Sequence, residues 1–170
     1  YIPMNNYFYE NTSFHNQGDS YGMYRYTAEL YMKYLMTAIG QGERISDKQH
    51  MMAYHFVMRR RPDGAHMQDG DMFNLPLTGY TPNDKPSFLA GNFYNDPYLR
   101  NEFYRNDYTY RNNQDELSAV TYLLLNKPEV GLKDQTELPL TWYAGDQQAV
   151  MTARTSWDEG INSNTMMVSM

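Results

Sequence analysis

The sequence contains no cysteine. This absence excludes a disulfide framework, a zinc site with thiolate ligands and a cysteine nucleophile. It does not fix the compartment, because a protein outside the cell does not need disulfides. The sequence also shows no membrane span and no signal peptide. If the chain is cut at its N-terminus, the missing signal says nothing about export.

Positive charge is scarce as well. The chain has 14 lysines and arginines against 20 aspartates and glutamates, which gives a net charge of -6. This balance argues against nucleic acid as a partner, since phosphate binding needs a basic surface. The arginines at residues 59–61 still form a local positive cluster, which suits the binding of carboxylate or sulfate groups. They also suit the C-terminus of a helix, and we expect that simpler role for at least one of them.

Tyrosine and methionine are abundant, with 17 and 13 residues, and aromatic residues make up 15% of the chain. A sugar-binding groove uses tyrosine in this way, because the ring covers the apolar face of the sugar and the hydroxyl binds its rim. A tyrosine-rich helical core has the same composition. Composition alone leaves both interpretations open.

Both ends of the chain are expected to be cuts in a longer protein. The chain starts at Tyr1, and residues 165–170 form an apolar, partly alternating run that is typical of a strand. The alternative is a trimmed domain with natural boundaries. We therefore expect an internal piece of a larger protein, without a complete active site of its own.

Hydrophobic periodicity predicts that the first part of the chain is helical. Helices are expected over residues 19–39, 46–58, 86–94, 96–105 and 114–126, with a loop over residues 65–85. The first of them carries two apolar stripes, which predicts burial between neighbours on both sides. These stripes are Tyr24, Ala28, Tyr31, Leu35 and Ala38, and Met23, Tyr26, Leu30 and Tyr34.

The pattern changes after Lys127, where proline and glycine interrupt a polar stretch. Short runs rich in β-formers then follow at residues 140–144, 149–157 and 165–170. The predicted class is therefore α+β. We expect a helical part over residues 1–126, a linker over 127–137 and the start of a sheet domain over 138–170.

His15 and Tyr54 are the candidate catalytic residues. His15 lies in a loop with amide and glycine neighbours, just before a predicted helix, where a histidine is well placed to meet a ligand. Tyr54 precedes the arginine cluster, and nearby cations lower the pKa of a phenol. The simpler interpretations are a loop histidine in a turn and a core tyrosine.

Other chemistries have weaker signals. The spacing of His50, His55 and His66 matches no metal site, and the sequence has no phosphate-binding loop and no serine-nucleophile elbow. The carboxylates of Asp69, Asp71 and Asp84 could serve a glycosidase. In an acidic protein such residues are more often solvated loop residues.

Five segments together resemble the heparinase II/III-like polysaccharide lyases, and they cover most of the chain in the matching order. They are residues 15–21 (His-Asn-Gln-Gly-Asp-Ser-Tyr), Tyr54 ahead of residues 59–64 (Arg-Arg-Arg-Pro-Asp-Gly), residues 69–71 (Asp-Gly-Asp), residues 138–143 (Leu-Pro-Leu-Thr-Trp-Tyr) and residues 151–158 (Met-Thr-Ala-Arg-Thr-Ser-Trp-Asp). The heparinase proper carries an acidic residue one turn after the first histidine, and in this chain Gly18 and Asp19 occupy that region. This departure leaves the exact glycan open.

The resemblance implies the C-terminal part of an incomplete α/α toroid, followed by the first strands of an antiparallel β-sandwich. It implies β-elimination at a uronic acid of a heparin-like or heparan sulfate-like glycan, with His15 and Tyr54 transferring protons. The substrate-binding candidates are Asn16, Gln17, Tyr21, Arg59 and Arg60. We expect His15 and Tyr54 to open onto one cleft near the arginine cluster.

The resemblance also sets expectations about cofactors, partners and location. It implies no metal or cofactor in this piece, and a structural zinc and a His-x-His pair in the missing part of the sandwich. The expected partner is an acidic polysaccharide, and a homodimer of the parent protein is compatible with it. The implied location is the bacterial periplasm or the exterior, and the piece alone is expected to be inactive.

Two other functions remain open at this point. One is a non-catalytic glycan-binding surface protein, which shares the richness in tyrosine and asparagine. The other is a glycoside hydrolase with a toroid fold, which requires two carboxylates facing across a groove.

Overall fold

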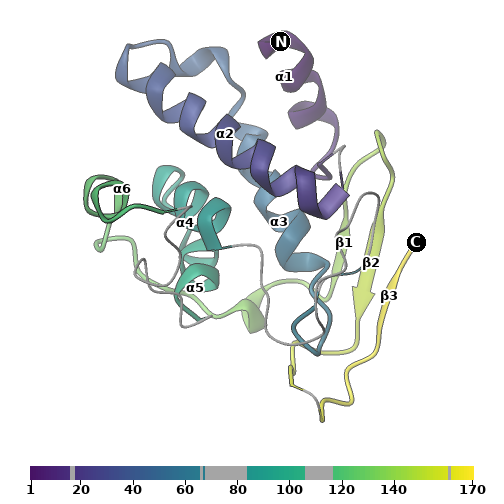
Figure 1. The fold of residues 1–170 in the computed structure, drawn as a ribbon. Helices are drawn as coiled ribbons and strands as arrows, with labels where there is room; N and C mark the ends of the chain where they lie inside the picture. The colour runs from purple at the N-terminus through teal and green to yellow at the C-terminus, as the bar shows by residue number, and fades with distance from the viewer. Residues whose placement is uncertain (16–17, 66, 68–83, 106–116, 161) are drawn as a thin grey trace.

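A computed structural model describes residues 1–15, 18–65, 67, 84–105, 117–160 and 162–170. Helices occupy the first part of the chain and strands the last, so the α+β prediction is confirmed at that level (Figure 1). None of the described helices is long and apolar enough to cross a membrane. The helices are α1 (Ile2–Asn11), α2 (Gly18–Ala38), α3 (Met51–Met58), α4 (Asp84–Phe93), α5 (Pro97–Arg105) and α6 (Ala119–Leu125), with short 3-10 turns at Gly42–Arg44, Asp47–His50 and Gln135–Glu137.

Helix α2 follows the predicted range closely but buries only one of its two apolar stripes. Tyr26 and Leu30 are fully buried, whereas Tyr24 is 60% and Leu35 68% exposed. Burial on both sides was therefore a wrong expectation for the described chain. Gly40 ends the helical segment with a φ of 72°, a left-handed conformation that glycine adopts without steric cost.

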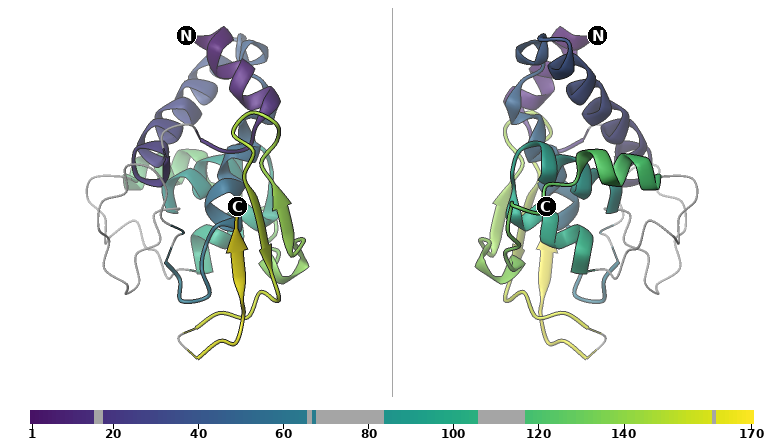
Figure 2. Two further views of the ribbon diagram at one scale, coloured as in Figure 1. Left: turned by 90° about the vertical axis from the view of Figure 1, so that its right-hand side faces the viewer. Right: turned by 90° about the vertical axis from the view of Figure 1, so that its left-hand side faces the viewer.

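Helix α3 lies at the centre of the fold. Figures 1 and 2 show it between the sheet on one side and α4 and α5 on the other. Ser46 caps the preceding 3-10 turn, since its side chain accepts a hydrogen bond from the backbone N–H of Lys48. A helix with apolar side chains on all sides is suited to this position. Its buried residues are Met52, Ala53, His55, Phe56, Val57 and Met58.

Helices α4 and α5 form a tight pair. Asp96 caps α5 as predicted, because its Oδ1 accepts hydrogen bonds from the backbone N–H groups of Tyr98 and Leu99 at 2.9 and 3.1 Å. The helices approach so closely at Gly91 that an added Cβ would lie 2.7 Å from the backbone nitrogen of Arg100. A larger residue at position 91 would separate the pair.

The remaining helices differ from the prediction. The sequence pattern gave no sign of α1, which begins directly after Tyr1. Helix α6 begins at Ala119 instead of near residue 114, because the side chain of Ser118 caps it by accepting from the backbone N–H of Thr121. Most of the expected loop over residues 65–85 lies outside the described residues.

The strands form a three-stranded antiparallel sheet in the order β1-β2-β3. They are β1 (Thr141–Tyr143), β2 (Met151–Arg154) and β3 (Met167–Ser169), each shorter than the apolar run that predicted it. Thr141 lies opposite Ala153, which lies opposite Val168. The inward side of β2 buries Thr152 and Arg154.

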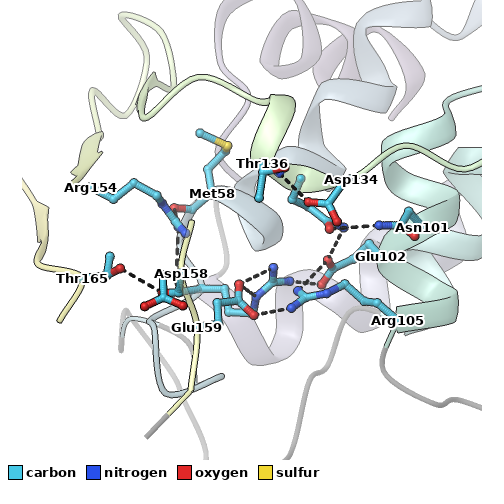
Figure 3. A network of polar contacts seen from close by, with 12 residues as sticks. Met58, Asn101, Glu102, Arg105, Asp134, Thr136, Arg154, Asp158, Glu159 and Thr165 are labelled. Atoms are coloured by element: carbon cyan, nitrogen blue, oxygen red, sulfur yellow. Dashed lines mark hydrogen bonds and ion pairs between the residues drawn. The ribbon is translucent and has the colours of Figure 1, made fainter. Parts of the chain in front are cut away.

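A buried ion network joins the helical part to the segment after β2 (Figure 3). The guanidinium of Arg60 pairs with the carboxylates of Glu102 on α5 and Glu159, and Arg105 pairs with both carboxylates too. Arg60 is 1% exposed and Glu102 fully buried. Such a network holds its elements in register, because an unpaired charge in the interior is very costly.

Arg154 forms a second link from the sheet to the helices. Its guanidinium donates hydrogen bonds to the backbone carbonyl oxygens of Met58 and Arg60, both at 2.9 Å. It also lies 3.7 Å from the ring centre of Trp157. Burial and the charge of Arg60 lower the pKa of Arg154 to about 10. The end of α3 is thus tied to the sheet through its own carbonyl groups.

The ion network predicts a large difference between neighbouring arginines. Replacing Arg60 with alanine leaves the buried carboxylate of Glu102 with less compensation, and we expect a loss of about 3–5 kcal/mol in the free energy of unfolding. Arg61→Ala is the matched control, since Arg61 is partly exposed and pairs with Asp63 at 2.5 Å. Its cost should be about 1 kcal/mol or less. Equal losses in chemical denaturation would contradict the role of Arg60.

The network also predicts an acid-sensitive fold. Burial alone raises the pKa of Glu102, but the charges of Arg60 and Arg105 outweigh it and hold this pKa below its ordinary value of 4.5. The stability contributed by the carboxylate is present above that ordinary value and is lost as pH falls through the lowered one. Glu102→Gln should therefore flatten the fall in unfolding free energy below pH 4.5. An unchanged fall in unfolding free energy would show that titrating groups other than Glu102 determine the acid sensitivity.

Candidate functional site

The segment between α1 and α2 is held in place by contacts to the sheet and to α3. The backbone N–H of Ser13 donates to the carbonyl of Ala144, just after β1, at 2.6 Å. The backbone N–H of His15 donates to Nδ1 of His55 on α3 at 3.3 Å. The ring centres of Phe14 and His55 lie 4.2 Å apart, with the ring planes tilted by 51°. Contacts to two separate elements therefore fix the backbone position of His15.

The side chain of His15 lies in a small enclosed hollow. It is 5% exposed, and its Nε2 is 3.9 Å from Oε1 of Glu29 on α2. Glu29 also accepts hydrogen bonds from the phenol of Tyr9 at 2.6 Å and the amide of Asn5 at 3.2 Å. The hollow has a volume of about 30 Å³ and is lined by Asn5, Phe8, Tyr9, His15, Glu29 and Met52.

The two nitrogens of the His15 ring have different surroundings. Nε2 faces the carboxylate of Glu29, whereas Nδ1 has no hydrogen-bond partner in the described part of the chain. Gly22 on α2 borders Nδ1, and a Cβ added there would lie 3.0 Å from it. A carboxylate at Nε2 favours the tautomer that carries its hydrogen there, which leaves the lone pair on Nδ1. That lone pair is buried beside Gly22 in this structure.

Tyr9 supports this arrangement from α1. Burial, followed by the charge of Glu29 and the hydrogen bond to it, raises the pKa of Tyr9 far above its ordinary value of 10. The phenol therefore stays neutral and keeps donating its hydrogen to Glu29.

Tyr54 lies in a different hollow, which is wide and open. The groove has a volume of about 670 Å³ and is lined by Asp47, Lys48, His50, Tyr54, Phe93, Tyr94, Asn95, Asp96, Pro97 and Tyr98. The phenol of Tyr54 donates to Oδ2 of Asp96 at 2.7 Å. Burial, and then the charge of Asp96, raise the pKa of Tyr54 well above 10. The expectation that nearby arginines lower this pKa is therefore wrong.

His15 and Tyr54 line separate hollows. The prediction that both side chains open onto one shared cleft is therefore wrong for the described structure. Helix geometry gives the reason. Met52 borders the hollow of His15, and Tyr54 follows two residues later on α3, about 200° around the helix axis. Tyr54 therefore points away from the side on which His15 lies.

The predicted substrate-binding residues differ in their exposure and in their contacts. Asn16 and Gln17 lie outside the described residues, and Tyr21 is 42% exposed near the start of α2. Arg59 is buried, with its guanidinium 5.2 Å from the ring centre of Phe14, beside His15. The guanidinium of Arg60 is occupied by the two carboxylates of the ion network, which gives this residue a structural role.

Sequence reasoning missed Glu29 and the contact between His15 and His55. A signal for Glu29 was present, since it follows Tyr26 by three residues on the buried side of the helix. An acidic residue at a core-facing position usually has a specific partner. Nothing in the sequence signalled the contact of His15 with His55, because it joins residues 40 positions apart.

Metal chemistry has no visible support in the described part of the chain. No group of three or more histidine, aspartate or glutamate residues there could hold a metal ion. Of the alternative glycosidase carboxylates, Asp69 and Asp71 lie outside the described residues, and the side chain of Asp84 does too.

The hollow predicts an unusual effect of Gly22→Ala. Alanine favours a helix over glycine by roughly 0.5–1 kcal/mol, but the added Cβ would lie 3.0 Å from Nδ1 of His15. We expect a fold at least as stable as the wild type, with displaced imidazole signals of His15 in NMR spectra. Gly131→Ala is the control, because nothing lies within 4 Å of its added Cβ. Undisturbed His15 signals in Gly22→Ala would refute this packing.

Comparison with known proteins does not assign the chain to a family. No family model matches it, and no curated protein was found to match its sequence. The geometry of the two hollows and the sequence motifs therefore carry the functional proposal.

Proposed function

We propose that the protein is part of a polysaccharide lyase that cleaves uronate-containing acidic glycans by β-elimination, with His15 transferring the proton. The observation that carries the proposal is the His15 hollow. It combines a fixed backbone, a carboxylate facing Nε2 and an Nδ1 without a partner in the described chain. The sequence resemblance supplies the reaction class.

The chemistry matches these groups. The base removes the hydrogen on C5 of the uronate, the C–H electrons form the C4=C5 double bond, and the bond from C4 to the glycosidic oxygen breaks. That oxygen leaves with its electron pair and takes up a proton. A neutral imidazole nitrogen is a suitable base near neutral pH. The carboxylate of Glu29 stabilises the imidazolium that forms.

The position of the hollow also supports a lyase. The carboxylate of the substrate gains negative charge as C5 loses its proton, and a nearby cation offsets this charge. Arg59 brings a guanidinium to the segment that holds His15. Tyr54 has the neutral phenol that an acid needs, but it lines a groove separate from the hollow of His15. His15 therefore carries the proposal without it.

A glycoside hydrolase is less well supported by the Tyr54 groove. Its two aspartates have structural partners, since Asp47 pairs with Lys33 at 2.8 Å and Asp96 caps α5. A hydrolase needs one carboxylate as an acid and the other as a base or nucleophile. Glycan binding without catalysis is the second candidate, because the same groove is lined by aromatic rings.

The lyase proposal predicts a large loss of activity in His15→Ala. With full-length protein and a uronate polymer, we expect the rate of unsaturated product formation to fall by about 100-fold or more. The product is followed by its ultraviolet absorption. Tyr143→Phe is the control, since this exposed phenol on β1 bonds only to Asp146 among the described residues. A His15→Ala variant that is folded and keeps wild-type activity would remove His15 from the mechanism.

A further inference from the structure

The groove beside Tyr54 has the size and lining of a sugar site. Its volume of about 670 Å³ lies within the range of roughly 300–1,000 Å³ that is usual for small-ligand pockets. It lies where the 3-10 turn before α3 faces the connection between α4 and α5. Tyr54, Tyr94, Tyr98 and His50 are half-buried there, so part of each ring is exposed.

Aromatic rings form a continuous wall of the groove. The rings of His50 and Tyr94 lie 5.1 Å apart, and that of Phe93 lies 4.8 Å from Tyr94. The ring of Tyr54 approaches His50 from the other side at 6.5 Å. The ring planes are inclined by 41°, 70° and 79° to one another, so the apolar C–H face of a pyranose would stack on one ring and contact the edges of its neighbours.

The polar atoms of the groove are mostly acceptors. Tyr54, Tyr94 and Tyr98 donate their phenol hydrogens to Asp96, Gln49 and Glu137, so each phenol oxygen keeps lone pairs for a ligand. Nδ1 of His50 lies 2.9 Å from the carbonyl oxygen of Asp47 and must carry the hydrogen, because a carbonyl only accepts. In the neutral ring, Nε2 of His50 is then an acceptor.

Tyr54 and Tyr94 keep their hydrogens across the ordinary pH range. Burial and the charge of Asp96 raise the pKa of Tyr54, and burial and the charge of Asp47 raise that of Tyr94. A wall of ring faces and oxygen acceptors complements a ligand that presents both C–H groups and many hydroxyl donors. A sugar ring is a ligand of that kind.

The charges of the groove decide which sugar it favours. Its lining contains two carboxylates, Asp47 and Asp96, against one ammonium group, that of Lys48. Lys48 is itself paired with Glu10 at 3.4 Å. Asp47 is likewise paired with Lys33 at 2.8 Å, which leaves the carboxylate of Asp96 as the lining charge without an ion-pair partner among the described residues. An anionic ligand would meet this one negative charge, which disfavours its binding.

We propose that this groove binds an uncharged pyranose residue of a glycan. It is a second sugar site, separate from the hollow of His15, and it selects against the uronate that the lyase reaction requires. The inference rests on the lining of the groove and stands whether or not the protein is a lyase. A neutral residue of a mixed glycan, or a neutral glycan attached nearby, would occupy it.

The test is direct binding to the full-length protein without turnover. The probes are neutral tetrasaccharides of glucose, mannose and galactose, with tetragalacturonate as the charged comparator, followed by calorimetry and by NMR. We expect at least one neutral probe to bind and to shift the signals of His50 and Tyr94. Tyr98→Ala should weaken this binding about tenfold through the loss of ring contact, whereas Tyr98→Phe should keep most of it.

Several outcomes would overturn the inference. They are the absence of binding by all neutral probes, tighter binding of tetragalacturonate at the same residues, and NMR shifts that avoid the groove. Tyr143→Ala, on the sheet, is the control and should bind as the wild type does. His15→Ala should also keep neutral-sugar binding, and its loss would contradict a separate site. Since this assay needs no catalysis, a failed lyase assay and a failed groove assay are distinguishable.

Discussion

The fold depends on the buried charges that connect α3, α5 and the segment after β2. Arg60 at the end of α3 bridges Glu102 and Glu159, which lie far apart in the sequence. Because neither Arg60 nor Glu102 is solvated, each requires the other, and the elements that carry them have little freedom to move apart. Arg154 adds hydrogen bonds to the carbonyl groups of the same helix end. Of the arginine cluster that suggested a ligand site, Arg60 is thus a structural joint.

The joint fixes the position of α3, the helix that separates the two hollows. One side of α3 carries Met52, which borders the hollow of His15, and the side about 200° around the helix axis carries Tyr54. One hollow is small and organised around a histidine and a carboxylate. The other is open, wide and aromatic. We propose proton transfer in the first and stacking of a sugar ring in the second, so the two proposed functions fall on different faces of one helix.

The sequence predicted those features that depend on interactions between residues close in the chain. The caps at Ser46 and Asp96 and the end of the helical segment at Gly40 were all predictable, because each depends on residues close in the chain. Helix α1 was missed, since its apolar pattern is weak and no side chain caps it. The separation of His15 from Tyr54 was not predictable either, because it depends on which way α3 faces in the folded chain. The raised pKa of Tyr54 follows from Asp96, a partner 42 residues away.

The central functional claim concerns the kind of bond cleavage, and the mass of the products decides it. Full-length protein should be incubated with a uronate-containing polysaccharide, and the new chain ends should be identified by mass spectrometry. Elimination predicts fragments with a C4=C5 double bond at the new non-reducing end, each lighter by one water molecule than the hydrolysis product. Fragments that have gained water at every cleavage would contradict a lyase and favour a hydrolase.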